Sequence, residues 1–117
     1  MKSILIVDDE LDILEILAEV LGARYHVKVA TNGEEALDVV AAAPPIDAIV
    51  LDLMMPVMDG SSFVHEMRRR GLKIPILLVS AVRDLPVRAA ELGVEGCCAK
   101  PCSPAVLEAA LTKIFAA

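Results

Sequence analysis

Short apolar runs recur at similar spacing along the 117-residue chain, with helix-like patterns between them. The runs are ILIV (4–7), YHVKVA (25–30), AIVL (48–51) and ILLV (76–79), and GCCA (96–99) is a weaker fifth. Three of them are apolar without alternation, which is typical of strands buried on both faces of a parallel sheet. YHVKVA alternates instead, so we expect that strand to lie nearer an edge.

The segments between the runs carry apolar residues at helical spacing. The first of these helices is predicted to bury one stripe, made of Ile13, Ile16, Leu17, Val20 and Leu21. Side chains that typically begin helices stand ahead of three later segments, at Asn32, Asp59 and Ser103. The segment 83–92, with Pro86 near its start, is the weakest helix. Strands and helices in alternation predict a doubly wound α/β sandwich, (βα)5, built as one domain.

Composition and charge narrow the class of protein. The residues are 56% hydrophobic but only 3% aromatic, so we expect a core of aliphatic side chains. A formal net charge of −6 argues against a surface that binds nucleic acid directly. The sequence shows neither a signal peptide nor an apolar run of transmembrane length, so we expect no membrane association. Three clustered cysteines do not make a disulfide framework, and we expect a reducing cytoplasm.

Polar side chains stand where the apolar runs end. They are Asp8 and Asp9 after the first run, Asp52 after the third, Ser80 after the fourth and Lys100 after the fifth. Ligands of open parallel sheets bind beyond the carboxyl ends of the strands. We therefore expect these side chains to meet in one shallow pocket.

Three carboxylates and one ammonium in a half-buried pocket need a counter-ion. Mg²⁺ fits best, because it binds carboxylates, keeps several waters and accepts phosphate oxygens, whereas Zn²⁺ prefers His and Cys. A metal, a lysine and a hydroxyl suit a phosphoryl group, and a spare carboxylate could attack it to form an aspartyl-phosphate. These residues leave open which carboxylate attacks. The pair Asp8–Asp9 looks more like the metal holder, which favours Asp52.

Four motifs stand in the order and approximate spacing of a known family. They are ILIVDDE (4–10), LDLMMPVMDG (51–60), LLVSA (77–81) and AKP (99–101). Together they resemble the receiver domain of two-component response regulators, over essentially the whole chain. The resemblance implies a single receiver domain over 1–117, without an output domain.

The resemblance also assigns roles at the strand ends. It implies that Asp52 accepts a phosphoryl group from a histidine kinase or a histidine phosphotransfer protein. Asp8 and Asp9, with Asp52 and the backbone carbonyl of Met54, would bind Mg²⁺.

Further expectations follow from the family. Ser80 and Lys100 would contact the phosphoryl oxygens, and the Lys100–Pro101 peptide would be cis. The five parallel strands would take the flavodoxin-like order 2-1-3-4-5. The chain would be a signalling switch in a two-component system or phosphorelay, changing how a downstream protein partner or output domain outside this chain binds. It would not be an enzyme, beyond catalysing its own phosphorylation and dephosphorylation.

The sequence departs from the family pattern near its last strand. Cys97 stands at the switch position, three residues before the lysine, where the family usually has Tyr or Phe. A thiol is much smaller than that aromatic ring and cannot report the shift of the hydroxyl residue in the same way. Met54 and Val82 occupy variable positions beside the pocket, and we hypothesise that they restrict an attacking water.

Other functions fit parts of this sequence less well. A pseudo-receiver that binds partners without switching is favoured mildly by Cys97 and opposed by the intact strand-end residues. A haloacid-dehalogenase-like phosphatase needs a second Asp two residues after the nucleophile, where this chain has Met54. A cysteine zinc site is disfavoured, because Cys97 and Cys98 would point to opposite faces of a strand. A redox-sensing role for Cys97 or Cys102 rests only on their location.

Overall fold

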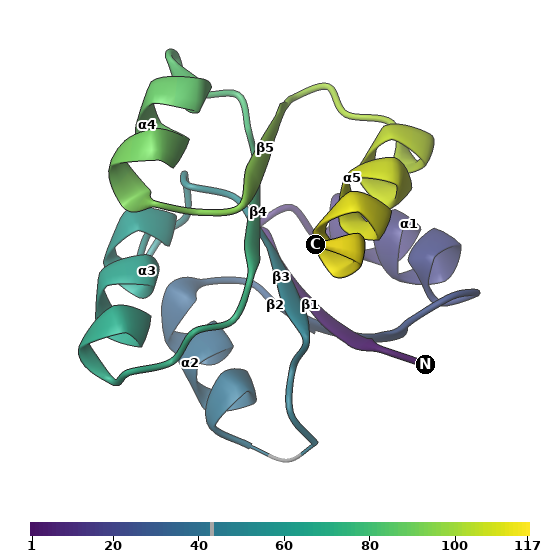
Figure 1. Cartoon of the computed structure of the whole chain (residues 1–117), viewed down its shortest axis with the longest axis horizontal. Coiled ribbons are helices and arrows are strands. Elements are labelled where there is room, and N and C mark those ends of the chain that lie inside the picture. The colour runs from purple at the N-terminus through teal and green to yellow at the C-terminus, as the bar shows by residue number, and fades with distance from the viewer. Residues whose placement is uncertain (43) are drawn as a thin grey trace.

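The computed structural model describes residues 1–42 and 44–117. Strands and helices alternate along the chain (Figure 1): β1 (Ser3–Val7), α1 (Leu11–Leu21), β2 (His26–Ala30), α2 (Gly33–Ala41), β3 (Ala48–Leu51), α3 (Gly60–Arg69), β4 (Ile76–Ser80), α4 (Leu85–Leu92), β5 (Gly96–Ala99) and α5 (Pro104–Ala116). The strands form one parallel sheet in the order β2-β1-β3-β4-β5. The predicted fold class and strand order are therefore confirmed.

The sheet separates two layers of helices and two hydrophobic cores. Figure 1 shows α1 and α5 on one face and α2, α3 and α4 on the other. Within β1, Leu5 and Val7 belong to the core under α2, α3 and α4, whereas Ile4 and Ile6 belong to the core under α1 and α5. Burial on both faces explains why this strand is apolar without alternation. β2 forms an edge of the sheet, as predicted, and only Ala30 of its residues is fully buried.

The predicted apolar stripe of α1 is partly wrong. Leu14, Leu17 and Leu21 are buried, but Ile16 and Val20 are 56% and 39% exposed. α1 contacts the sheet and α5 along a narrow line, so the buried face follows steps of three and four residues from Leu14. Ile13 still packs against this core as a half-buried side chain, whereas Leu11, Ile16 and Val20 lie outside that line.

Side-chain caps begin three helices at the predicted places. The side chains of Asn32, Asp59 and Ser103 each accept a hydrogen bond from the backbone N–H three residues later. α4 has no such cap, because Asp84 takes a left-handed conformation with φ 54° instead. This helix spans eight residues, in keeping with its weak pattern. No helix within residues 1–42 and 44–117 has the length and apolar character needed to cross a membrane.

Candidate functional site

The predicted strand-end residues meet at one edge of the sheet. Asp8 and Asp52 directly follow β1 and β3, which are neighbouring strands. The Lys100 N–H donates to the Ser80 carbonyl at 3.0 Å, which holds the end of β5 beside the end of β4. Parallel pairing thus brings residues up to 92 positions apart into direct contact.

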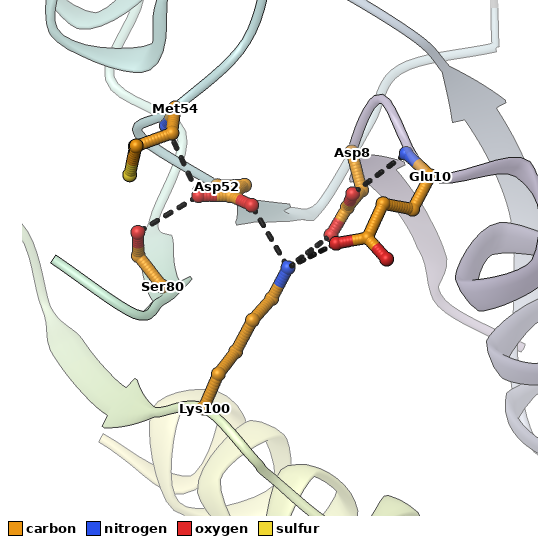
Figure 2. A network of polar contacts seen from close by, with 6 residues as sticks. All are labelled: Asp8, Glu10, Asp52, Met54, Ser80 and Lys100. Atoms are coloured by element: carbon orange, nitrogen blue, oxygen red, sulfur yellow. Dashed lines mark hydrogen bonds and ion pairs between the residues drawn. The ribbon is translucent and has the colours of Figure 1, made fainter.

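Lys100 connects the two buried carboxylates (Figure 2). Its Nζ lies 2.8 Å from Asp8 Oδ2 and 2.8 Å from Asp52 Oδ2. Asp8 is 4% exposed and Asp52 6% exposed. Burial would lower the pKa of Lys100, but hydrogen bonds to Asp52 and Asp8 outweigh it and hold that pKa above its usual value. The ammonium therefore stays charged throughout the physiological pH range.

The other oxygen of Asp52, Oδ1, has two donors. Asp52 Oδ1 accepts hydrogen bonds from Ser80 Oγ at 2.8 Å and from the Met54 N–H at 3.0 Å (Figure 2). Ser80 is completely buried. Donors on both oxygens fix the orientation of this carboxylate. The same hydroxyl and ammonium can donate to a negatively charged group placed on Asp52.

An acidic cluster forms the open side of the site. Carboxylate oxygens of Asp8, Asp9 and Asp52 lie within 4.8 Å of one another, and Asp9 is exposed. The backbone N–H of Glu10 donates to Asp8 Oδ1 at 2.9 Å, which orients that carboxylate. Three hard oxygen donors with access to solvent suit Mg²⁺, which retains several of its waters. The residues present therefore fit the predicted metal.

The loop after β3 approaches the site closely at Gly60. The Gly60 N–H donates to the Leu53 carbonyl at 3.0 Å. A Cβ at Gly60 would lie 2.5 Å from the Asp52 carbonyl oxygen and 2.8 Å from Leu53 Cα. Both are backbone atoms, which cannot rotate away. The glycine is therefore needed for α3 to begin this close to Asp52.

Two residues near the site were missed by the sequence interpretation. Glu10 Oε1 lies 3.8 Å from Lys100 Nζ (Figure 2), and its place in ILIVDDE was the only signal for it. Arg88 lines a shallow hollow at the rim, together with Asp9, Met54 and Val82. Its Nη2 donates to Ser61 Oγ at 3.4 Å, and no sequence pattern pointed to that contact.

The cysteines lie beside the site and not in the acidic cluster. Cys97 packs against the core under α2, α3 and α4, whereas Cys98 and Cys102 pack against the core under α1 and α5. The expectation that Cys97 and Cys98 point to opposite faces is confirmed. The Lys100–Pro101 peptide is cis, as the resemblance implied.

Comparison with known proteins identifies the family. A family model described as the response regulator receiver domain matches residues 4–112. The chain belongs to this family. Among solved structures, the chemotaxis protein CheY4 of Vibrio cholerae has a TM-score of 0.87 and 31% sequence identity, covering 97% of this chain and 98% of that one.

Curated relatives of this receiver domain are longer proteins. A probable transcriptional regulator, ycf27, of Cyanophora paradoxa is 40% identical over 97% of this chain, which spans 48% of that protein. The sensor histidine kinase TmoS of Ectopseudomonas mendocina is 36% identical over 96% of this chain, which spans 12% of that protein. The chain thus covers less than half the length of these relatives. Membership of the family is consistent with a phosphorylation-based signalling switch.

Proposed function

We propose that residues 1–117 act as one receiver unit, in which Asp52 accepts a phosphoryl group from the phosphohistidine of a kinase or phosphotransfer protein. The observation that carries this proposal is the double pairing of the Asp52 carboxylate. One of its oxygens lies 2.8 Å from Ser80 Oγ and the other 2.8 Å from Lys100 Nζ. A nucleophile held between two donors is oriented before the phosphoryl group arrives.

The transfer follows from this geometry. An oxygen of Asp52 attacks phosphorus, the N–P bond of the donor breaks, and the leaving imidazole keeps the electron pair and takes up a proton. Lys100 and Ser80 then donate to phosphoryl oxygens in place of Asp52 oxygens, where negative charge develops in the transition state. When bound by Asp8, Asp9, Asp52 and the Met54 carbonyl, Mg²⁺ supplies further neutralisation of that charge.

We propose no turnover of a diffusing substrate. A phosphatase that forms an aspartyl-phosphate needs a general acid, and Met54, two residues after Asp52, has a 62% exposed thioether side chain instead. A pseudo-receiver is disfavoured because Asp8, Asp52, Ser80 and Lys100 make a connected network. Hydrolysis of p-nitrophenyl phosphate that depends on Asp52 would revive the phosphatase alternative.

The partners follow from the donor chemistry. A receiver domain calls for a phosphohistidine donor, and a relative of this chain is named a sensor histidine kinase. We propose that phosphorylation changes the binding of a downstream protein, or of an output domain outside residues 1–117.

The donor and the metal can be tested together. The chain is incubated with phosphoramidate, which carries an N–P bond like that of phosphohistidine, and phosphorylation is read as retardation on a phosphate-affinity gel. We expect a retarded band with Mg²⁺ and none with EDTA. Asp9→Asn should need a higher Mg²⁺ concentration for half-maximal labelling, whereas Asp38→Asn, an exposed position on α2, should not. Labelling that is equal in Mg²⁺ and EDTA would contradict the metal assignment.

A further inference from the structure

Two of the three cysteines around Lys100 share one face of the sheet. The segment EGCCAKPC (95–102) contains all three, and the proposed function uses none of their thiols. Cys98 and Cys102 pack against the core under α1 and α5, and Cys97 packs against the opposite core. The three thiols therefore divide into a pair, Cys98 and Cys102, and a single thiol, Cys97, on the opposite face.

Cys102 stands four residues after Cys98, across a bend in the backbone. The chain bends at Lys100 and again at Pro101, so the two cysteines flank a turn. Burial raises the pKa of Cys102 to about 11, and the neighbouring Cys98 thiol contributes a smaller part of this increase. Both cysteines are free and half-buried, so each keeps a path to solvent.

We propose that Cys98 and Cys102 form a covalent modification site, a dithiol that closes to a disulfide on exposure to a low-molecular-weight disulfide such as oxidised glutathione. The closed loop contains Lys100, which contacts Asp8 and Asp52. Formation of the bond is independent of the proposed function. Its consequence for phosphoryl transfer rests on that function.

The exchange has two balanced steps. The thiolate of one cysteine attacks a sulfur of the small disulfide, forms a mixed disulfide and releases one small thiolate, which takes up a proton. The thiolate of the second cysteine then attacks the protein sulfur of the mixed disulfide and releases the second small thiol. The two cysteines lose two protons and two electrons, and the small disulfide is reduced to two thiols.

Cys97 is the built-in control for this pairing. It neighbours Cys98 in sequence, but successive residues of a strand point to opposite faces. A bond between these two cysteines would have to distort β5, whose Cys97 and Cys98 pair with Leu78 and Val79 of β4. Closure through Cys98 and Cys102 leaves that pairing in place.

Closure should slow phosphorylation. Lys100 has to move from an Asp52 oxygen to a phosphoryl oxygen, and a short covalent loop restricts that movement. We expect the oxidised chain to be labelled by acetyl phosphate about tenfold more slowly than the reduced chain, since small misplacements of catalytic groups have effects of this order or larger. Addition of dithiothreitol should restore the rate.

The bond is tested by intact-mass measurement and thiol counting. The chain, dilute enough to disfavour dimers, is incubated with oxidised glutathione at about pH 9. Burial raises the pKa of Cys102, and a pH above neutral increases the fraction of its reactive thiolate. We expect the mass to fall by two hydrogen atoms. After denaturation, iodoacetamide should add once, at Cys97, and three times to a reduced sample.

Variants decide which thiols are joined. Cys97→Ser should still lose two hydrogen atoms, and Cys98→Ser and Cys102→Ser should not. Cys98→Ala and Cys102→Ala repeat the test if a serine variant does not fold. Loss of two hydrogen atoms by either Cys98 variant, stable glutathione adducts without closure, or three alkylatable thiols after oxidation would overturn the pairing. An unchanged labelling rate in the closed chain would overturn the consequence for Lys100.

Discussion

The hydroxyl of Ser80 is fully buried and donates to Asp52 at 2.8 Å, so it is in place to follow a phosphoryl group onto that residue. We predict that Ser80→Ala slows labelling by acetyl phosphate about tenfold, because one hydrogen bond in the transition state is worth about 1.4 kcal/mol. Ser80→Thr keeps the hydroxyl and should stay within about threefold of the unchanged chain. Equal rates for Ala and Ser would contradict a role for this hydroxyl.

Met54 and Val82 line the rim of the site and offer no polar atom of their side chains to an incoming water. We predict that Met54→Asn and Val82→Glu each shorten the phosphoryl lifetime, by up to about tenfold, because a side chain that orients water assists its attack. Decay is followed by intact mass after removal of acetyl phosphate. Val87→Glu, exposed on α4 and outside the rim, is the matched control. If the phosphoryl group decayed at an unchanged rate in both rim variants, Met54 and Val82 would have no role in restricting water.

At the scale of elements, the start of α3 depends on the close approach of Gly60 to the backbone of Asp52 and Leu53. Gly60→Ala would place a Cβ 2.5 Å from the Asp52 carbonyl oxygen, and backbone must move to relieve the contact. We predict a loss of about 2 kcal/mol in the free energy of unfolding, together with slower labelling of Asp52. Urea denaturation measures the free energy of unfolding, and incubation with acetyl phosphate measures the rate of labelling.

Gly96→Ala is the control for that variant. Its Cβ would meet only Leu77 Cδ1, at 3.2 Å, and a side-chain methyl can shift. We expect it to cost clearly less stability and to leave labelling unchanged. If the two glycine variants behaved alike, the close contact with Asp52 would not be the cause.

Across the whole molecule, Lys100 links stability to pH. Its pKa is raised in the folded chain, so its contribution is fully present below the pKa of an unfolded lysine, about 10.4. That contribution is lost only as pH rises through the higher folded value. Lys100→Met should destabilise the chain by about 3 kcal/mol at pH 7, because Asp8 and Asp52 lose their buried counter-charge.

The pH dependence of this difference can be measured by urea denaturation. The gap between Lys100→Met and the unchanged chain should be constant from about pH 7 to pH 9 and should shrink only at more alkaline pH. Lys73→Met, an exposed position, should show almost no gap at any pH. A gap that already shrinks below pH 9 would contradict the raised pKa.

Much of this fold could be predicted because apolar runs and helix caps are local signals. The same runs placed Asp8, Asp52, Ser80 and Lys100 at one edge of the sheet, and the structure brings them into contact. Which face of α1 is buried could not be predicted, because it depends on how α5 and the sheet are placed. The strand order itself came from the family resemblance and not from the residues alone.

The side-chain contacts within the site could not be predicted from the sequence. Glu10 and Arg88 reach the site through side-chain directions that spacing does not encode. The proposed pairing of Cys98 with Cys102 similarly depends on the turn between them. Local patterns therefore located the site, while its contacts depend on packing between elements distant in sequence.

Asp52 is the proposed phosphoacceptor, and every role given to the other site residues depends on it. Intact-mass measurement of the chain after incubation with acetyl phosphate and Mg²⁺ tests it most directly, with Asp52→Asn as the matched variant. We predict an added mass of one phosphoryl group on the unchanged chain, lost on mild alkaline treatment, and none on Asp52→Asn. No adduct on the unchanged chain, or an equal adduct on Asp52→Asn, would contradict it.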